Sequence, residues 1–374
     1  MLNAAPHPLT ASDRFDWLRL LRSENVGPIT FYQLLNRFGS AQAALEALPD
    51  LARRGGRQRP LVIASKAVVE RELAALAKAG ASLVGWGEPF YPPALAAVDD
   101  APPLLSIKGQ QEMLTRPAIA IVGARNASAN GRRFARDMAL QLGGHHLVVA
   151  SGLARGIDAA AHEGALPTGT IAVLAGGIDT VYPEENRALQ DEIAERGVLI
   201  AEMPPGTEPQ ARHFPRRNRI ISGVALGILV VEAAVGSGSL ITARLALDQG
   251  REIFAVPGSP LDPRCRGTND LIRKGAHLVE SAADIMGQIE PLLAKPLAER
   301  RRALFTAAAT AAPDEQDLDA ALDRVLSLLS PSPVEVDELV RQCQFSPAIV
   351  ITVLLELELA GRIERQPGNH VALL

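Results

Sequence analysis

The sequence is poor in cysteine and has no long apolar run. It has only two cysteines, Cys265 and Cys343, which lie far apart and outside any CxxC spacing. This count argues against a disulfide framework or a structural zinc site. No stretch of about 18 apolar residues occurs, and the first residues lack the basic-then-apolar pattern of a signal peptide. We therefore expect a protein of the reducing cytoplasm, with no membrane span, metal or cofactor.

Aromatic residues are scarce and the net charge is small. Aromatic residues make up 4% of the chain, so the position of each one is informative. The formal net charge is −4, which means that any site for a polyanion must be a local patch. Apolar residues reach 47%, enough for a core, and 374 residues suggest two or three domains.

Two common nucleotide-binding motifs are missing. The sequence has no GxGxxG fingerprint and no GxxxxGK[ST] loop. In the segment IAIVGARNASANG, Arg125 stands where the second glycine would be needed for close approach to a pyrophosphate. The sequence therefore predicts neither dinucleotide binding of that type nor P-loop hydrolysis.

Residues 1–80 are expected to form a helical domain. Apolar residues recur at helical spacing, are interrupted at Asn25-Val26-Gly27-Pro28, and resume until Gly39. The stretch VGPITFYQLLNRFGS is typical of a helix–hairpin–helix or SAM-like module, which either contacts a DNA phosphate or packs against protein. The basic stretch RRGGRQRP at 53–60 is interpreted as a solvated loop.

Residues 81–290 alternate short apolar runs with helical stretches. The middle runs are apolar on both faces, as in buried parallel strands, so we expect a doubly wound, extended Rossmann-like α/β domain. The predicted strands are Ser82–Trp86, Leu104–Lys108, Ala118–Gly123, Leu147–Ser151, Thr170–Ala175, Val198–Glu202, Gly227–Glu232, Glu252–Val256 and Ala276–Val279.

The C-terminal part is expected to be a linker, 291–317, followed by a winged-helix domain, 318–374. Three helical stretches precede a two-stranded wing that turns at Gly368-Asn369. The third helix, AIVITVLLELELAG, carries Glu356 and Glu358 but no basic residue. A helix that reads a major groove needs Arg, Lys, Asn or Gln, so a protein-contact role is favoured over duplex recognition.

Several loops that follow strands carry groups suited to anions. Gly123, Arg125 and Ser128 follow one strand, and Ser151 and Arg155 follow the next. Glycine allows a close backbone approach, arginine is a planar cation, and a helix N-terminus attracts anions. The alternative is that these residues only end strands, cap helices and form structural ion pairs. Asp158 and His162, four residues apart, suggest a general base, but a structural pair is favoured.

The segment ARHFPRRNRIISG is the strongest candidate for a nucleic-acid contact. Phe214 is flanked by four arginines, Arg212, Arg216, Arg217 and Arg219. Stacking of a base on an aromatic ring with arginines beside it is how single strands are held without sequence preference. The alternative is that Phe214 belongs to the core.

A last candidate lies in GSGSLITA. Its Ser237, Gly238 and Ser239 offer donors at a helix start, and Asn269 offers an amide. One nucleotide needs one or two such loops. A row of them along one sheet edge favours an extended polyanion.

Taken in order, these motifs resemble the DprA (Smf) family of DNA-processing proteins. The matching stretches are IVGAR..S, SGLARGIDAAAH, GTIAVLAGGID..YP.EN, FPRRNRIISG, VVEA..GSGSLITARLA, REIFAVPG and GTNDLIRKGA. The resemblance implies a SAM-like domain, a Rossmann-like domain and an accessory winged helix. It implies binding of single-stranded DNA near Arg125 and Phe214, loading of the RecA recombinase in natural transformation, and a homodimer formed through the α/β domain.

Two other functions remain open. A nucleotide-processing hydrolase of the LOG type would carry PGGxGTxxE, whereas this chain has GSGSLITA without the glutamate that such chemistry uses. A regulator that binds a free nucleotide is the second alternative. We expect a binding protein with no catalytic residue.

Overall fold

The computed structural model describes residues 9–293, 315–366 and 369–374. These fall into two compact units. One combines Leu9–Glu70 with the described part of Ala303–Leu374, and the other is the described part of Arg71–Arg302. Most of the predicted linker, at 294–314, lies outside the described residues. In the part of the chain that is described, no helix has the length and hydropathy needed to cross a membrane.

The α/β unit contains all nine predicted strands in one sheet. The strand order is β1-β2-β6-β5-β4-β3-β7-β8-β9. Strands β3 to β9 are parallel, and β1 and β2 add an antiparallel edge. The strands are β1 (Ser82–Gly85), β2 (Leu104–Gly109), β3 (Ala118–Gly123), β4 (Val148–Ser151), β5 (Thr170–Gly177), β6 (Val198–Met203), β7 (Gly227–Val231), β8 (Glu252–Ala255) and β9 (His277–Leu278).

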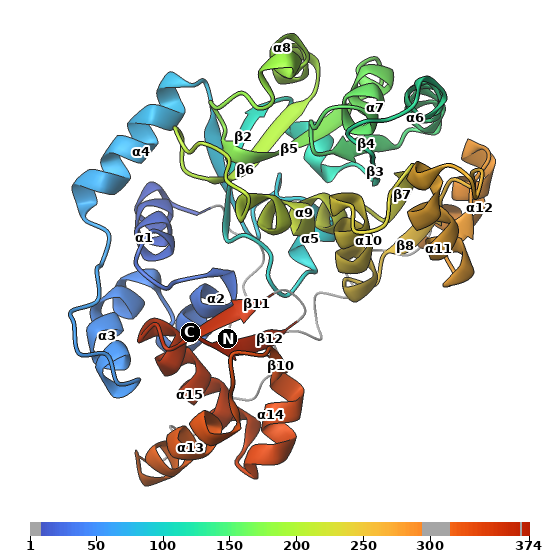
Figure 1. Ribbon diagram of the computed structural model, residues 1–374. Helices are drawn as coiled ribbons and strands as arrows, with labels where there is room; N and C mark the ends of the chain where they lie inside the picture. Colours follow the sequence, from blue (N-terminus) through green and yellow to red (C-terminus); the bar gives the residue numbers. More distant parts are fainter. Residues whose placement is uncertain (1–8, 294–314, 367–368) are drawn as a thin grey trace. The chain divides into compact units, whose positions relative to one another are not determined.

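Helices cover both faces of this sheet, which confirms the doubly wound architecture. In Figure 1, α6, α7 and α8 lie above the sheet and α9 and α10 lie below it. Because both faces are covered, the middle strands are buried throughout, as their continuous apolar runs predict. The helices are α4 (Lys66–Lys78), α5 (Pro93–Ala96), α6 (Ala129–Gly144), α7 (Ile157–Ala165), α8 (Arg187–Arg196), α9 (His213–Val224), α10 (Gly238–Asp248), α11 (Arg266–Arg273) and α12 (Ala282–Leu293), with short 3₁₀ turns at Gln111–Thr115, Glu184–Asn186 and Pro263–Cys265.

The second unit is built from the two ends of the chain. Its N-terminal part has α1 (Ala11–Leu21), α2 (Pro28–Phe38) and α3 (Ala41–Arg54), and Gly39 ends α2 in the left-handed conformation. Its C-terminal part has α13 (Glu315–Leu328), α14 (Val336–Cys343) and α15 (Pro347–Leu359) with strands β10 (Val334–Glu335), β11 (Ile363–Gln366) and β12 (His370–Leu373). The predicted winged helix is confirmed, although Gly368 of its turn lies outside the described residues.

The N-terminal helices and the winged helix share a core. Leu355 and Leu359 of α15 pack with the buried side chains of α2 and α3. The predicted hairpin also contacts α15, because the Asn25 side-chain amide donates to the Leu359 carbonyl at 3.2 Å. Every residue from 353 to 360 is buried as a result. The third helix of the winged helix is thus an internal helix of this unit.

Candidate nucleic-acid interface

The order in which strands are added to the sheet reverses between the parallel strands β3 and β7. Ligands of such sheets usually bind at the carboxyl ends of the strands at this switch point. Gly123 ends β3 so close to β7 that a Cβ atom would clash with the Val231 carbonyl oxygen. The adjoining position is already filled by a carboxylate. Glu232 accepts a hydrogen bond from the Ser128 main-chain N–H at 2.9 Å, and the Ser128 hydroxyl donates to it as well.

Ser128 is therefore engaged within the protein. Its hydroxyl oxygen also accepts from the Gly131 N–H at 2.9 Å, which makes it the N-cap of α6. The Glu232 carboxylate takes the favourable place of an anion at this helix N-terminus. The free surface for a ligand lies beside this point, toward β4 and β5.

A pocket opens there around Phe214, the second residue of α9. Its lining residues are Gly152, Ala154, Leu174, Ala175, Gly176, Thr180, Tyr182, Pro209, Phe214 and Arg217. The Phe214 ring is half-buried. The exposed Arg125 guanidinium lies over it, 5.1 Å from the ring centroid, and the Tyr182 ring is tilted against it at 5.6 Å. The first loop and the arginine-rich segment therefore meet at one aromatic ring.

Arg217 supports this ring from inside the protein. Its side chain is 6% exposed and donates to the main-chain carbonyls of Gly152 and Val173. Gly152 is required because a Cβ there would lie 2.5 Å from the Arg217 guanidinium. Burial lowers the pKa of Arg217 to about 10, and Asp158 acts in the opposite direction. Arg217 is a fully packed cation that remains charged at neutral pH.

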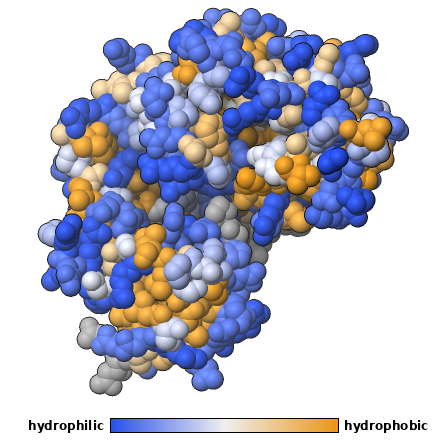
Figure 2. Space-filling model, viewed as in Figure 1, coloured by the Kyte–Doolittle hydropathy of each residue, from blue (hydrophilic) through white to orange (hydrophobic). Residues whose placement is uncertain are grey.

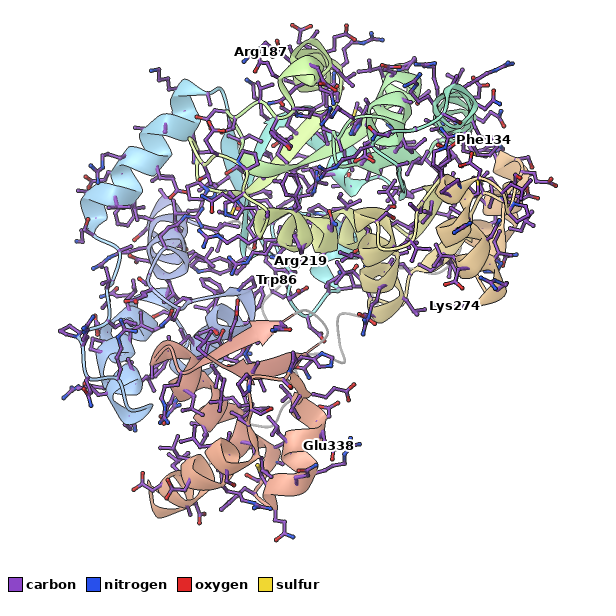
Figure 3. All side chains as sticks on the ribbon, viewed as in Figure 1. Trp86, Phe134, Arg187, Arg219, Lys274 and Glu338 are labelled. Atoms are coloured by element: carbon purple, nitrogen blue, oxygen red, sulfur yellow. The ribbon has the colours of Figure 1, made fainter. Side chains whose placement is uncertain are left out.

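Two other predicted contact residues are also inside the protein. Arg219, labelled on α9 in Figure 3, is 6% exposed and pairs with the carboxylates of Glu202 and Asp100. Burial opposes its charge, but these carboxylates outweigh burial and raise the pKa of Arg219. Ser151 is fully buried, and its hydroxyl donates to the Ile121 carbonyl at 2.6 Å. Of the arginines proposed as DNA contacts, Arg217 and Arg219 therefore lie inside the protein, whereas Arg212 and Arg216 are exposed.

Exposed arginines lie on the segments that line this pocket or neighbour it. Arg125 follows β3, and Arg212 and Arg216 lie at the start of α9. Arg155 is exposed as well, with Glu185 at 3.5 Å from its guanidinium. Exposed arginines on neighbouring loops offer planar donors to phosphate groups.

The GSGS turn and Asn269 are placed beyond β7 and β8. Ser237 is the N-cap of α10, its hydroxyl lies 2.8 Å from that of Ser239, and Gly238 is exposed. The Asn269 amide makes a two-way bond with Gly258, accepting from its N–H at 3.1 Å and donating to its carbonyl at 2.9 Å. The Asn269 amide therefore holds the main chain at Gly258. Among the described residues, no ring contact joins the GSGS turn or Asn269 to Phe214.

Comparisons with known proteins identify the family. Residues 82–290 match the family described as DNA recombination-mediator protein A, residues 11–75 match the DprA-like N-terminal HHH domain, and residues 309–369 match the DprA winged helix domain. The chain belongs to the DprA family.

Relatives and solved structures agree with this family. The chain is 38% identical to Protein Smf of Escherichia coli over 82% of this chain and 81% of that protein. It is 45% identical to DNA processing protein DprA of Streptococcus pneumoniae over 54% and 71%. The crystal structure of the pneumococcal protein covers 75% of this chain and 99% of that chain, with a TM-score of 0.62 and 35% identity.

A DNA processing protein A from Helicobacter pylori, whose structure addresses a single-stranded-DNA-binding mode, covers 56% of this chain and 96% of that chain. Its TM-score is 0.52 and its identity 28%.

Sequence reasoning missed the Tyr182 contribution to the site of this DprA-family chain. Tyr182 is not among the candidate residues of the sequence, yet it is 43% exposed and lines the pocket beside Phe214. The signal was available, because a tyrosine in a chain with three tyrosines follows a strand end. What the sequence could not show is that this turn reaches the N-terminus of α9.

Asp158 and His162 have separate hydrogen-bond partners inside the protein. Both side chains are buried, and Asp158 accepts a hydrogen bond from the Gly152 N–H at 3.2 Å. The Thr170 hydroxyl donates to the Val149 carbonyl, so the His162 Nδ1 must carry the proton of their 2.7 Å bond. Burial lowers the pKa of His162 to about 3, which keeps the ring neutral.

Proposed function

We propose that this chain binds single-stranded DNA at the pocket around Phe214 and acts as a recombination mediator. The observation that carries the proposal is the half-buried Phe214 ring with the exposed Arg125 guanidinium over it. An aromatic platform with arginines beside it holds a single strand through base stacking and phosphate contacts. The likeness to the Helicobacter pylori protein, 28% identical, supports the same assignment.

The proposed contacts divide into three roles. A base is proposed to take the place of the Arg125 guanidinium over the Phe214 ring, beside Tyr182, while Arg125 moves to the adjoining phosphate. Arg212, Arg216 and Arg155 are exposed and are proposed as further phosphate contacts, with the donors of Ser237, Gly238 and Ser239 beyond β7. The buried Arg217 is proposed to hold the platform, because its Nη1 donates to two main-chain carbonyls and its guanidinium lies 5.9 Å from the centroid of the Phe214 ring.

The partners are proposed from the family. Loading of RecA in natural transformation and homodimer formation through the α/β unit are the expectations for a DprA-family chain. Figure 2 shows apolar side chains on the visible face of the α/β unit around α10 and α11, which supports a dimer surface. Large apolar side chains exposed in this part of the chain are Val235, Ile241, Leu247 and Leu261. A cytoplasmic location, expected from the two cysteines, is part of the same proposal.

We favour a binding protein over an enzyme. The side chains best suited to act as a base, Asp158 and His162, are buried and hydrogen-bonded, and Glu232 is held by Ser128. A LOG-type hydrolase would need a carboxylate free to act beside the bound sugar. Release of a free base from nucleoside monophosphates by the purified protein would revive that alternative.

Fluorescence anisotropy with a labelled poly-dT strand and a duplex of equal length, at two salt concentrations, tests the proposal. We expect salt-sensitive preference for the single strand. Phe214→Ala should weaken poly-dT binding by about 5- to 150-fold, the equivalent of 1–3 kcal/mol, with little change in salt slope. Arg125→Ala should flatten the salt slope by about 0.7, because one phosphate contact is lost.

The matched control is Arg187→Ala, which removes an exposed arginine of α8 in the same unit. It should leave both affinity and slope unchanged. Wild-type affinity in Phe214→Ala, with the fold intact, would assign the ring to packing and remove the pocket from the proposal. Tight binding of mononucleotides without oligonucleotide binding would favour the nucleotide-binding regulator instead.

A further inference from the structure

The basic loop 53–60, interpreted from the sequence as solvated, is fitted against the winged helix. A Cβ atom on Gly55 would clash with the Glu356 carbonyl oxygen, so only glycine lets the loop lie against α15. Gly56 (φ +91°) faces Arg362, and Gly361 (φ +72°) faces Asn25 and Arg57. These glycines allow the N-terminal loop and the turn between α15 and β11 to meet with their main chains in contact.

This junction gathers arginines from both ends of the chain. A Cβ on Gly56 would lie 3.3 Å from the Arg362 guanidinium, and one on Gly361 would lie 3.5 Å from that of Arg57. Arg59 follows on the same loop, and its carbonyl accepts a hydrogen bond from the Arg57 side chain at 3.0 Å. We call this set the composite rim; its members are Arg53, Arg54, Arg57, Arg59 and Arg362.

Carboxylates compensate only part of this charge. Asp50 pairs with Arg53, Glu24 lies 2.7 Å from Arg57, and Glu356 lies 3.5 Å from Arg54. Glu364, exposed on β11, is the remaining acid close in sequence.

Among the described residues, the side chains of Arg59 and Arg362 have no hydrogen-bond or ion-pair partner, and both are exposed. These two guanidinium groups therefore add positive charge to the junction that no described carboxylate compensates.

We propose that the composite rim is a second nucleic-acid site, which holds the phosphate backbone of duplex DNA. Guanidinium groups bind phosphate through paired, planar donors, and Arg57 links the two exposed arginines, because its side chain donates to the Arg59 carbonyl and lies near Gly361, next to Arg362 in sequence. Trp17, Phe31, Tyr32 and Phe38 of the same unit pack with the core of the N-terminal helices, and Phe345 packs with that of the winged helix. The members of the rim are all arginines, and a duplex has a higher charge density than a single strand, so we assign the rim to a duplex.

The rim replaces the contact that winged helices usually make. α15 is buried from 353 to 360, so it cannot enter a major groove in this arrangement. Phosphate contacts of this kind carry no sequence information. The site is independent of the pocket around Phe214, so either one can fail without the other.

The test uses the full chain, a labelled blunt duplex of about two helical turns, and saturating unlabelled poly-dT to occupy the pocket around Phe214. Arg59→Ala/Arg362→Ala should bind the duplex several-fold more weakly and flatten its salt slope by about 1.8, because two B-DNA phosphate contacts are lost. Its affinity for labelled poly-dT, measured separately, should stay at the wild-type value. Arg59→Gln/Arg362→Gln repeats the test with side chains that remain polar.

The matched control is Arg324→Ala/Arg341→Ala, which removes the same charge from exposed positions of α13 and α14 in the same unit. It should keep the wild-type slope. Equal weakening in both double variants would assign the effect to net charge and overturn the proposal. So would an unchanged slope in the rim variants, a wild-type protein without salt-dependent duplex binding, or a loss confined to poly-dT.

Discussion

Helices α9 and α15 both carry ionisable side chains into the protein interior, basic ones on α9 and acidic ones on α15. In the α/β unit, α9 buries Arg217 and Arg219. In the other unit, α15 buries Glu356 and Glu358. Each helix would be assigned to DNA recognition by its motif alone, because one lies in an arginine-rich segment and the other is the third helix of a winged helix.

The two helices differ in how fully these charges are compensated. Arg217 donates to two main-chain carbonyls, and Arg219 meets two carboxylates. On α15, Glu358 accepts from Arg365 at 2.8 Å, while Glu356 has Arg54 at 3.5 Å and the charge of Arg37 nearby. Its Oε1 atom accepts no hydrogen bond among the described residues, and the Arg217 Nε on α9 likewise has no partner there. Buried charges are tolerated where they are both paired and hydrogen-bonded.

They differ also in what remains exposed. Arg212, the N-cap of α9, and Arg216 in its first turn stay at the surface, while every residue from 217 to 224 is buried. α15 is exposed at Pro347, Ala348 and Ile351 and is enclosed from 353 onward. Which helix can contact a ligand is therefore decided by the residues that stay exposed, and not by the motif to which the helix belongs.

The largest expected effect is the loss of a compensated charge on α9. Arg219→Met should lower the free energy of unfolding of the α/β unit by about 3 kcal/mol, because Glu202 and Asp100 lose their partner while half-buried. Chemical denaturation measures it. Arg216→Met, on the exposed side of the same helix, is the matched control and should change stability by less than about 0.5 kcal/mol. Similar values for both variants would mean that α9 is not anchored by Arg219.

The sheet was predictable because its strands are continuous apolar runs between helical stretches. All nine runs became strands of one sheet, with ends shifted by one or two residues. The meeting of Arg125 and Phe214 was also within reach, since both follow strands whose carboxyl ends share an edge.

The burial of Arg219 was not predictable, because helical spacing groups it with the exposed Arg212 and Arg216. Its partner Asp100 is 119 residues away in sequence.

The sequence of α15 predicts that the helix packs against protein, but it does not identify the partner. A helix that is apolar on all sides is buried, and AIVITVLLELELAG has this pattern. The sequence therefore favoured a protein contact over duplex recognition. That the partner is the N-terminal part of the same chain could not be derived, because Asn25 and Leu359 are separated by 334 residues.

The buried His162 of the α/β unit makes the free energy of unfolding depend on pH, with a smaller effect than Arg219→Met. The folded pKa of His162 is about 3, below its ordinary value of 6.5, because burial opposes the charge and Arg217 adds repulsion. The unfolded chain therefore binds a proton first, and stability is lost as the pH falls below 6.5. Between pH 7 and 5 the loss from this group is about 2 kcal/mol. Denaturant titrations at both pH values measure it.

His162→Leu should remove that part of the loss, whereas His145→Leu, an exposed position at the end of α6, should keep it. An unchanged difference between pH 7 and 5 in His162→Leu would show that the ring is already protonated in the folded protein, or that solvent reaches it.

The smallest expected effect, of opposite sign, belongs to Glu356 on α15. Burial raises its pKa, and Arg54 and Arg37 oppose this rise while Asp319 adds to it. A raised carboxyl pKa means that the folded protein binds the proton more readily, so stability from this group falls as the pH rises above 4.5. Glu356→Gln should therefore stabilise the unit at pH 7, by up to about 1 kcal/mol, and the gain should shrink toward pH 5.

Hydrogen exchange along α15 measures this difference, with the exposed Glu364→Gln of β11 as the control. Stabilisation would mean that the buried acid weakens the contact between the winged helix and the N-terminal helices. Faster exchange in Glu356→Gln at pH 7 would instead mean that the Arg54 pair outweighs burial, and that both helices rely on compensated charge.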